Sequence, residues 1–184
     1  MNEPLDNIIM LSVKAGDIDK MGLLFNRYHR LLYNFLFHMT YNREASEDMV
    51  QNVFYRMLKY RHTFTGNGEF RIWMYHLARN VLKDHMKNRK KTSTKDNIDA
   101  LADKTGGGDP ADEPFGKKQD KLQLYQAMEK LKDEDREILT LSKFQELKYQ
   151  EIARIMDMNE GTVKVRVHRA FHQLKNIYQQ QGLI

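Results

Sequence analysis

Apolar side chains in the first half of the chain recur every three or four residues. Three such runs occur, which are Leu24, Tyr28, Leu31, Phe35 and Met39, then Ala45, Met49, Val53 and Met57, and then Met74, Leu77, Ala78 and Val81. This spacing places the members of a run on one face of an α-helix, whereas a half-buried strand alternates every second residue. No sustained alternation of that kind occurs in the sequence, so we expect helices only.

The second half shows the same helical pattern after an interruption. Its runs are Leu122, Tyr125 and Met128, then Ile138 and Leu141, then Ile152, Ile155 and Met156, and then Val163, Val167, Ala170, Phe171 and Leu174. Between the halves, residues 92–116 are rich in Gly, Pro and acidic residues and poor in large apolar ones, a composition that does not form a packed core. The sequence therefore predicts an all-α fold of two small helical domains, 1–91 and 119–184, joined by a flexible linker, 92–118.

Composition excludes several classes of site. The 184 residues include no Cys, which excludes disulfides and thiolate sites for zinc or redox chemistry. The seven His are scattered without the spacing of metal ligands, so we expect neither a metal nor a cofactor. No apolar run approaches the ~20 residues of a membrane span, and the N-terminus lacks the layout of a signal peptide, so the expected location is the cytoplasm.

Charge is distributed unevenly along a chain whose net charge is +5. Residues 1–91 carry 15 Lys and Arg against 9 Asp and Glu, residues 92–116 carry 2 against 6, and residues 117–184 carry 13 against 10. Basic blocks attract a polyanion through Coulomb attraction and counterion release. An ordinary solvated surface explains the same charge equally well, so charge alone does not decide for nucleic acid.

Residues 149–163 fit two short helices joined by a tight turn. Ala153 is small where the second helix must pack closely, and Asp157 tolerates the positive φ expected at the turn. Asn159 suits the N-cap of the second helix, because its side chain can accept a hydrogen bond from a free backbone N–H. The sequence therefore predicts a helix-turn-helix.

The second helix of this pair has the residues of a DNA-reading helix. Its apolar run would face inward and turn Lys164, Arg166 and Arg169 outward. Arg and Lys side chains on a helix in the major groove can reach guanine edges or phosphates. A purely structural hairpin with a basic face is the alternative.

This stretch resembles the fourth-region signature of bacterial ECF (extracytoplasmic-function) sigma factors. The matching residues are Glu151-Ile152-Ala153, Gly161-Thr162-Val163-Lys164, Arg166, His168-Arg169-Ala170 and Leu174, with Leu131 and Asp135-Arg136-Glu137-Ile138-Leu139 upstream. The resemblance implies that the helix reads the minus-thirty-five promoter element. The implied contacts are Thr162, Lys164, Arg166 and Arg169. The chain departs from the family at Lys148, where Ser is usual, and at Asp157, where Gly is usual.

A second group of candidates lies on the helix predicted around residues 45–57. Asp48, Gln51 and Tyr55 fall outside its apolar stripe, and the ring of Phe54 lies on the edge of that stripe. From the pattern alone, a wide core stripe with solvated neighbours is the alternative to a docking surface. The run Ala45-x-Glu47-Asp48-x-x-Gln51-x-x-Phe54 resembles the second-region motif with which sigma factors bind the clamp helices of the largest RNA polymerase subunit. The resemblance implies that these residues dock on the polymerase.

The helix predicted after residue 70 and the loop before it carry candidates for promoter melting. They are Asn67, Phe70, Trp73, Tyr75, Arg79, Asn80, Lys83 and Lys87. The three basic residues recur every four positions, which suits a phosphate backbone, and unstacked bases can stack on exposed rings. We expect one or two of the three rings to be buried core. The segment resembles the minus-ten-reading region of ECF factors, and its loop matches the loop that captures one unstacked base in that family.

From these motifs the chain is identified as a member of the ECF sigma factors, which are not enzymes and direct promoter-specific transcription initiation. The implied partners are core RNA polymerase, through its clamp helices and flap, promoter DNA and an anti-sigma factor. In that family the matching linker threads the basic RNA-exit path of the polymerase. The acidic residues suited to that path are Asp96, Asp99, Asp103, Asp109, Asp112 and Glu113. A solvated spacer is the alternative for this linker.

Two other functions are open from the residues alone. A conventional helix-turn-helix regulator would bind duplex DNA by itself and would not need polymerase. The run Arg79-Asn80-x4-His85 also fits the loose pattern of HEPN-type ribonucleases, all-α enzymes in which His85 would serve as general base. That pattern accounts for neither the docking motif nor the helix-turn-helix.

Overall fold

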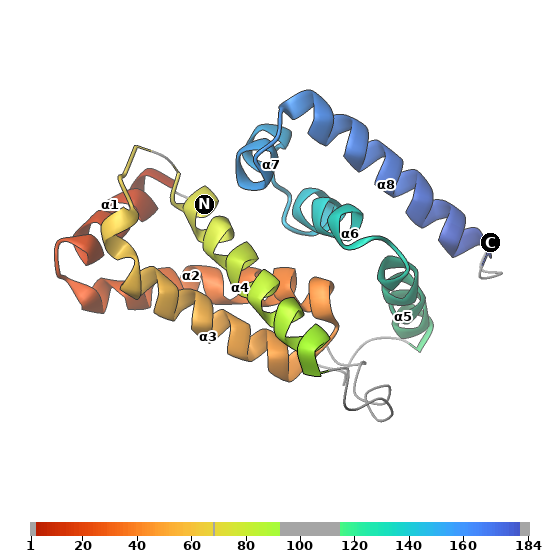
Figure 1. The fold of residues 1–184 in the computed structure, drawn as a ribbon, viewed down its shortest axis with the longest axis horizontal. Coiled ribbons are helices and arrows are strands. Elements are labelled where there is room, and N and C mark those ends of the chain that lie inside the picture. The colour runs from red at the N-terminus through yellow and green to blue at the C-terminus, as the bar shows by residue number, and fades with distance from the viewer. Residues whose placement is uncertain (1–2, 68, 93–114, 181–184) are drawn as a thin grey trace. The chain divides into compact units, whose positions relative to one another are not determined.

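A computed structural model describes residues 3–67, 69–92 and 115–180. Its elements in chain order are α1 (Glu3–Lys14), η1 (Ile18–Lys20), α2 (Met21–Thr40), α3 (Arg43–Lys59), η2 (Arg61–Thr63), α4 (Phe70–Thr92), α5 (Phe115–Glu129), α6 (Asp133–Leu139), η3 (Thr140–Phe144), α7 (Tyr149–Met156) and α8 (Glu160–Gln180). Within these ranges every regular element is helical (Figure 1), which confirms the predicted all-α fold.

The chain divides into two compact units. The first comprises Met1–Leu36 with Glu44–Asp99, and the second comprises Phe37–Arg43 with Ala100–Ile184. The predicted linker, 92–118, lies mostly in residues 93–114, and its six acidic residues are outside the described part of the chain.

The first unit packs α2, α3 and α4 through the predicted apolar stripes. The buried members of those stripes in this unit are Leu24, Tyr28, Phe35, Met49, Val53, Met57, Met74, Leu77, Ala78 and Val81. Leu31 differs from the prediction, because it is half-buried while its neighbour Leu32 is fully buried. Rings join the layers, since Tyr28 lies 5.2 Å from Phe70 and Phe35 lies 5.5 Å from Tyr75, measured between ring centroids.

The second unit contains the helix-turn-helix formed by α7 and α8, which pack together with α6. The buried members of its predicted stripes are Met128, Ile138, Leu141, Ile152, Ile155, Met156, Val163, Val167 and Ala170. The predicted stripe of α8 is too wide, because Phe171 is 50% exposed. Eight residues after Val163, Phe171 is rotated about 80° away from it at 100° per residue, outside the arc that meets α6 and α7.

Two absences within the described residues bear on the expected site classes. Across 3–67, 69–92 and 115–180, no helix is long and apolar enough to cross a membrane. In the same part of the chain, no three His, Asp or Glu side chains form a group that could hold a metal ion.

Candidate functional site

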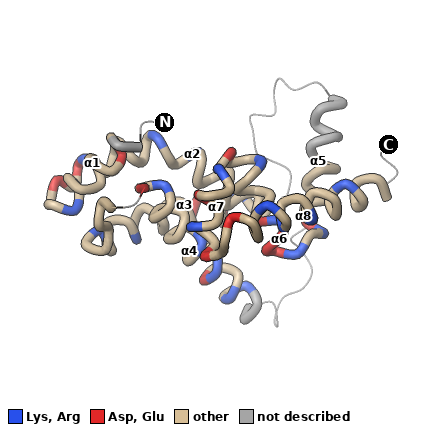
Figure 2. The backbone as a smooth tube through the Cα atoms, turned by 90° about the horizontal axis from the view of Figure 1, so that it is seen from above, with Lys and Arg blue, Asp and Glu red and all other residues tan. Residues whose placement is uncertain are grey.

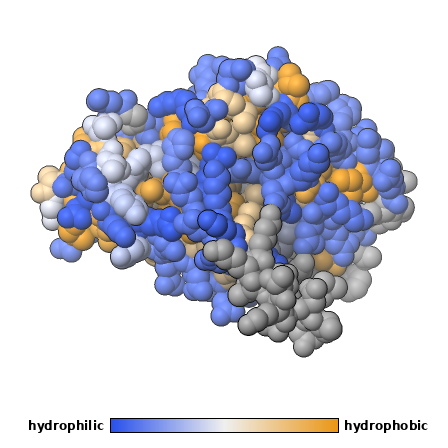
Figure 3. Space-filling model, in the orientation of Figure 1, coloured by the Kyte–Doolittle hydropathy of each residue, from blue (hydrophilic) through white to orange (hydrophobic). Residues whose placement is uncertain are grey.

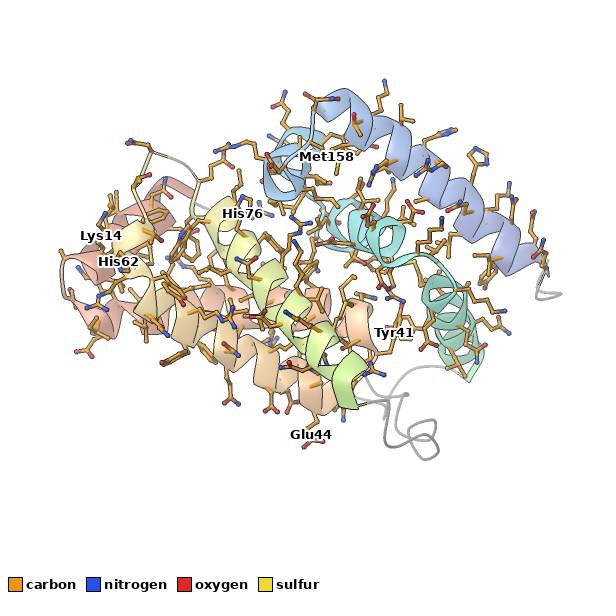
Figure 4. The ribbon with its side chains drawn as sticks, viewed as in Figure 1. Lys14, Tyr41, Glu44, His62, His76 and Met158 are labelled. Atoms are coloured by element: carbon orange, nitrogen blue, oxygen red, sulfur yellow. The ribbon has the colours of Figure 1, made fainter. Side chains whose placement is uncertain are left out.

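The turn between α7 and α8 has the backbone that its residues predict. Asp157 lies in the left-handed region, at φ 55° and ψ 53°, and it ends α7. The backbone N–H of Met158, labelled at this turn in Figure 4, donates to the carbonyl oxygen of Ala153 over 2.9 Å. At the start of α8, Asn159 Oδ1 accepts a hydrogen bond from the backbone N–H of Thr162 over 2.7 Å. These bonds confirm the positive φ at Asp157 and the N-cap at Asn159.

The start of α7 has one of the two hydrogen bonds of a capping box. The carboxylate of Glu151 accepts a hydrogen bond from the backbone N–H of Lys148 over 2.7 Å. A Ser at position 148 could return a bond to the first turn, whereas a Lys ammonium has no acceptor. The absence of that second bond lowers the stability of α7 by about 1 kcal/mol at most, so the helix still forms.

Two of the predicted DNA contacts on α8 are bound to acidic residues of α6. Arg166 is half-buried and donates from Nη1 to Glu134 Oε2 over 2.8 Å. The guanidinium of Arg169, 58% exposed, lies 3.6 Å from the buried carboxylate of Asp135. Both acids lie in the first turn of α6, where a negative charge interacts favourably with the helix dipole. Lys164, in contrast, is exposed.

The exposed face of α8 also includes two residues that are not among the predicted DNA contacts. Val165 is 67% exposed, and His168 is exposed beside it one turn further on. Together with Lys164 they line a shallow groove whose other wall includes Lys143 and Tyr149. A search restricted to Lys and Arg overlooks a Val and a His. The spacing of 161, 164, 165 and 168 along one side of the helix could have identified this face.

The candidate docking face on α3 is exposed except for Phe54. Asp48, Gln51 and Tyr55 follow helical spacing, and all three are exposed, Tyr55 by 62%. Phe54 is only 6% exposed, and its ring packs 4.9 Å from that of Phe25 in α2. Tyr55 is therefore the aromatic residue that this face offers to a partner.

Of the three rings predicted beside the melted DNA, two belong to the core. Phe70 and Tyr75 are 1% exposed each, as expected for one or two of the three. Trp73 is half-buried, and its Nε1 donates to Thr63 Oγ1 over 3.3 Å. Its ring lies 5.3 Å from that of Phe64, so part of the indole is covered within the fold.

The polar candidates on α4 form an exposed basic face. Asn80, Lys83 and Lys87 are exposed and Arg79 is half-buried. Figure 2 shows Lys and Arg gathered toward the C-terminal end of this helix. Asp84 on the same helix accepts a hydrogen bond from Arg56 of α3 over 2.7 Å, so it fixes α4 to α3. In the space-filling view of Figure 3, hydrophilic residues cover most of the visible face of the described chain.

His85 lies on α4 next to this salt bridge. Partial burial, followed by the nearby positive charge of Arg89, lowers the pKa of His85 below its usual value, while Asp48 of α3 acts in the opposite direction. The neutral ring is therefore favoured.

The loop that leads into α4 is also exposed at its tip. Asn67 is exposed, and its backbone N–H lies 3.4 Å from Thr65 Oγ1. Gly66 has φ +75°, a value that suits Gly.

Comparison with known proteins gives matches over both halves of the chain. The Sigma-70 region 2 family matches residues 24–92, and the Sigma-70, region 4 family matches residues 121–174. The chain is 30% identical over 157 residues to the ECF RNA polymerase sigma factor SigM of Bacillus subtilis, and the match covers 84% of this chain and 93% of SigM. It is 29% identical over 168 residues to the ECF RNA polymerase sigma factor BldN of Streptomyces coelicolor, over 89% of this chain and 62% of the longer BldN.

A solved structure shares the fold. The sigma factor RpoE of Bartonella quintana, crystallised with the anti-sigma factor NepR, superposes with a TM-score of 0.71 over 86% of this chain and 96% of RpoE. The two sequences are 19% identical, so this likeness concerns the fold alone.

Proposed function

This chain belongs to the ECF RNA polymerase sigma factors of the sigma-70 family, and we propose that it binds core RNA polymerase and directs it to promoters with defined minus-ten and minus-thirty-five elements. The observation that carries the proposal is the presence of regions 2 and 4 in one chain, in family order, with 28 residues between 92 and 121. So short a connection holds no third-region domain of the kind found in primary sigma factors.

The polymerase docks on the exposed face of α3 in this proposal. Asp48 and Gln51 supply the polar contacts, and Tyr55 supplies the exposed aromatic anchor. Phe54 supports that face from behind through its contact with Phe25. The clamp helices of the largest subunit are the proposed partner of this face, and the flap is the proposed partner of the region 4 unit.

The minus-ten element binds along α4 and at the loop before it. Lys83 and Lys87 contact phosphates, since both are exposed on one side of the helix. Arg79 and Asn80 stabilise the melted strand, and Asn67 contacts one unstacked base. Phe70 and Tyr75, being buried, support the helix without touching DNA.

The minus-thirty-five element is read by α8. Lys164 and Arg169 are exposed enough to reach DNA, and Val165 and His168 extend the same face. Val165 suits a thymine methyl group, and His168 can hydrogen-bond a base edge. Thr162 binds a phosphate near the helix N-terminus, and Arg166 orients α8 through its bond to Glu134.

Two further parts of the proposal concern partners and the linker. An anti-sigma factor is a proposed partner, because the RpoE relative was solved with NepR. The acidic linker is proposed to enter the basic RNA-exit path by charge complementarity. No catalytic step is assigned to any residue of the chain.

Reconstitution with purified core polymerase tests the proposal. Core alone and core with this protein would be compared in run-off transcription from a library of promoter fragments. We expect promoter-selective transcripts only with the protein present, and retention of the protein on immobilised core. A conventional regulator would instead bind duplex DNA without polymerase, in the range of about 10⁻⁸–10⁻¹¹ M typical of specific DNA binding, and would leave core inactive.

A further inference from the structure

Helix α1 precedes the region 2 match, which begins at residue 24, yet it contacts the segment that leads into α4. Three of its residues make these contacts, Asn7, Leu11 and Lys14. They are spaced four and three residues apart, which places them on one face of the helix. Figure 1 shows α1 beside this segment, and Figure 4 shows Lys14 near His62 of η2.

Asn7 caps α4 from another helix. Its Oδ1 accepts a hydrogen bond from the backbone N–H of Phe70 over 2.8 Å. Phe70 is the first residue of α4, and its N–H has no partner within the helix. The side chain of Asn7 therefore determines where α4 begins relative to α1.

Leu11 contacts the tip of the entry loop, which we define as residues 64–67. A Cβ on Gly66 would lie 3.1 Å from both methyl carbons of Leu11, closer than nine in ten real Cβ contacts. Gly66 also has φ +75°, which disfavours any other residue there. The backbone of the loop therefore rests directly on the Leu11 side chain.

Lys14 binds the other end of the entry loop. Its Nζ donates to the carbonyl oxygen of Phe64 over 2.6 Å. Phe64 is 2% exposed, and its ring lies 5.3 Å from that of Trp73 and 6.3 Å from that of Phe70. The start of the loop, its tip and the first residue of α4 thus each contact a different residue of α1.

The helix that makes these contacts is itself fixed to α2. Asp6 is 1% exposed, and its Oδ2 accepts a hydrogen bond from the hydroxyl of Tyr28 over 2.5 Å. Its other oxygen accepts a hydrogen bond from Arg27. Because a buried carboxylate holds α1 against α2, α1 gives the entry loop a rigid support.

We propose that α1 sets the position of the entry loop and thereby the base preference at the minus-ten element, with Asn7, Leu11 and Lys14 as positioning residues. Thr65 and Asn67 remain exposed at the supported tip, where they can meet an unstacked base. This inference rests on the proposed function, since it requires that the loop contact promoter DNA. The three residues touch no DNA and act through the loop.

Base preference in the holoenzyme tests this role. Core polymerase carrying wild type, Asn7→Leu or Lys14→Met would transcribe a promoter library randomised across the minus-ten element. We expect the preference at one minus-ten position to fall by about five- to tenfold in both variants, because a displaced loop no longer meets its base in the right geometry. Asn7→Asp and Lys14→Arg keep the acceptor and the donor, so they should restore the preference.

Matched controls separate positioning from loss of folded protein. Ile8→Ala alters an α1 side chain that is 60% exposed, and Lys20→Met removes a partly exposed Lys whose ammonium lies 3.0 Å from Asp17. Both controls should keep the wild-type preference. A smaller folded fraction lowers transcription from all templates equally, so it leaves the ratio between bases unchanged.

The variant Gly66→Ala tests the contact between Leu11 and the entry loop by changing the loop instead of α1. The added methyl group must displace either Leu11 or the loop, so this variant should weaken the base preference at the same minus-ten position.

Hydrogen exchange of the full-length protein gives a readout without DNA. Amides of residues 64–67 should exchange faster in Asn7→Leu and Lys14→Met, while those of α3 stay unchanged.

The outcomes distinguish this inference from the proposed function. Wild-type preference in Asn7→Leu, Lys14→Met and Gly66→Ala, with unchanged exchange in the loop, would overturn the role of α1 while leaving a working sigma factor. If wild-type protein itself gives no promoter-selective transcription, the proposed function fails, and the role of α1 in base preference fails with it.

Discussion

Arg166 of α8 donates a hydrogen bond to Glu134 of α6 over 2.8 Å, which joins the predicted DNA-reading helix to the helix that supports it. The guanidinium is half-buried, whereas Glu134 has a side chain exposed by 74%. The pair therefore lies at the edge of the contact between α6 and α8, and its first role is to orient α8.

The pair should contribute little to stability and should behave as a unit. Arg166→Ala and Glu134→Gln should each lower the free energy of unfolding by about 0–1 kcal/mol, as is usual for solvent-exposed ion pairs. The decrease in the free energy of unfolding should be smaller in the double variant than the sum of the two single decreases, because each single change already removes the same bond. Urea denaturation followed by circular dichroism measures all three, and full additivity would show that the two residues are not coupled.

Base recognition upstream should depend on the exposed face of α8. Changing Val165 or Arg169 to Ala should relax sequence preference at the minus-thirty-five element, by about 1–3 kcal/mol for each base that is no longer recognised. Lys164→Ala should weaken binding uniformly and reduce the salt slope by about one. Selection of holoenzyme on a randomised upstream library, repeated at several salt concentrations, separates the two effects. Unchanged preference in both the Val165 and Arg169 variants would remove this face from recognition.

Variants of the docking face on α3 should fall into two kinds, according to whether the changed side chain is exposed or buried. Asp48→Ala, Gln51→Ala and Tyr55→Ala should weaken binding to core polymerase without changing helicity, because these side chains are exposed. Phe54→Ala should in addition destabilise the protein by about 3–5 kcal/mol, as truncation of a buried ring does. Titration of labelled protein with core, next to thermal melts by circular dichroism, checks both statements. Wild-type affinity in the three exposed variants would mean that the polymerase docks elsewhere.

Promoter melting should depend on α4. Holoenzymes with Arg79→Ala or Asn80→Ala should form closed complexes but open them slowly, because the separated strands are then less well stabilised. A template with a pre-melted bubble should rescue them in part, since the cost of unstacking is then already met. Permanganate footprinting on duplex and bubble templates measures this difference. Loss of closed complexes without rescue would indicate a folding or docking role instead.

Acid should weaken the fold in part through His85. Because burial and Arg89 lower the pKa of this His in the folded protein, the unfolded chain binds the proton first as the pH falls. Stability associated with the neutral ring is therefore present above the usual pKa of about 6.5 and decreases as the pH falls below it. His85→Gln should show a shallower fall in melting temperature between about pH 7 and pH 5. The effect should be small, because His85 is only partly buried and solvent screens its charge. Identical pH profiles would exclude His85 as a contributor.

The helices and the turn of the helix-turn-helix could be predicted because their causes are local. The 3.6-residue period places most of the predicted core residues correctly, and Asp157 and Asn159 act on backbone groups within four residues of themselves. The predicted stripe of α8 includes Phe171, which is exposed, so the buried arc of this helix is narrower than its apolar residues indicate. How wide a helix face is buried depends on the size of the neighbouring helices, which periodicity does not contain.

The partners of individual side chains could not be predicted, because they come from distant parts of the chain. The pattern places Tyr55 outside the apolar stripe of α3 but leaves Phe54 on its edge, and the burial of Phe54 is seen only in the fold, where its ring packs against Phe25 of α2. Arg166 could be recognised as basic, but its bond to Glu134 spans 32 residues. The support of the entry loop by Asn7 spans 63 residues, and no spacing rule relates those positions.

By itself, the sequence determined the helices, the two-part organisation and the family, because period, turn residues and motifs are properties of neighbouring positions. The tertiary structure alone decided which candidate side chains are free to meet a partner. Exposure depends on what packs against a residue, and here that is set by α2 behind α3, α6 behind α8 and α1 beside the entry loop.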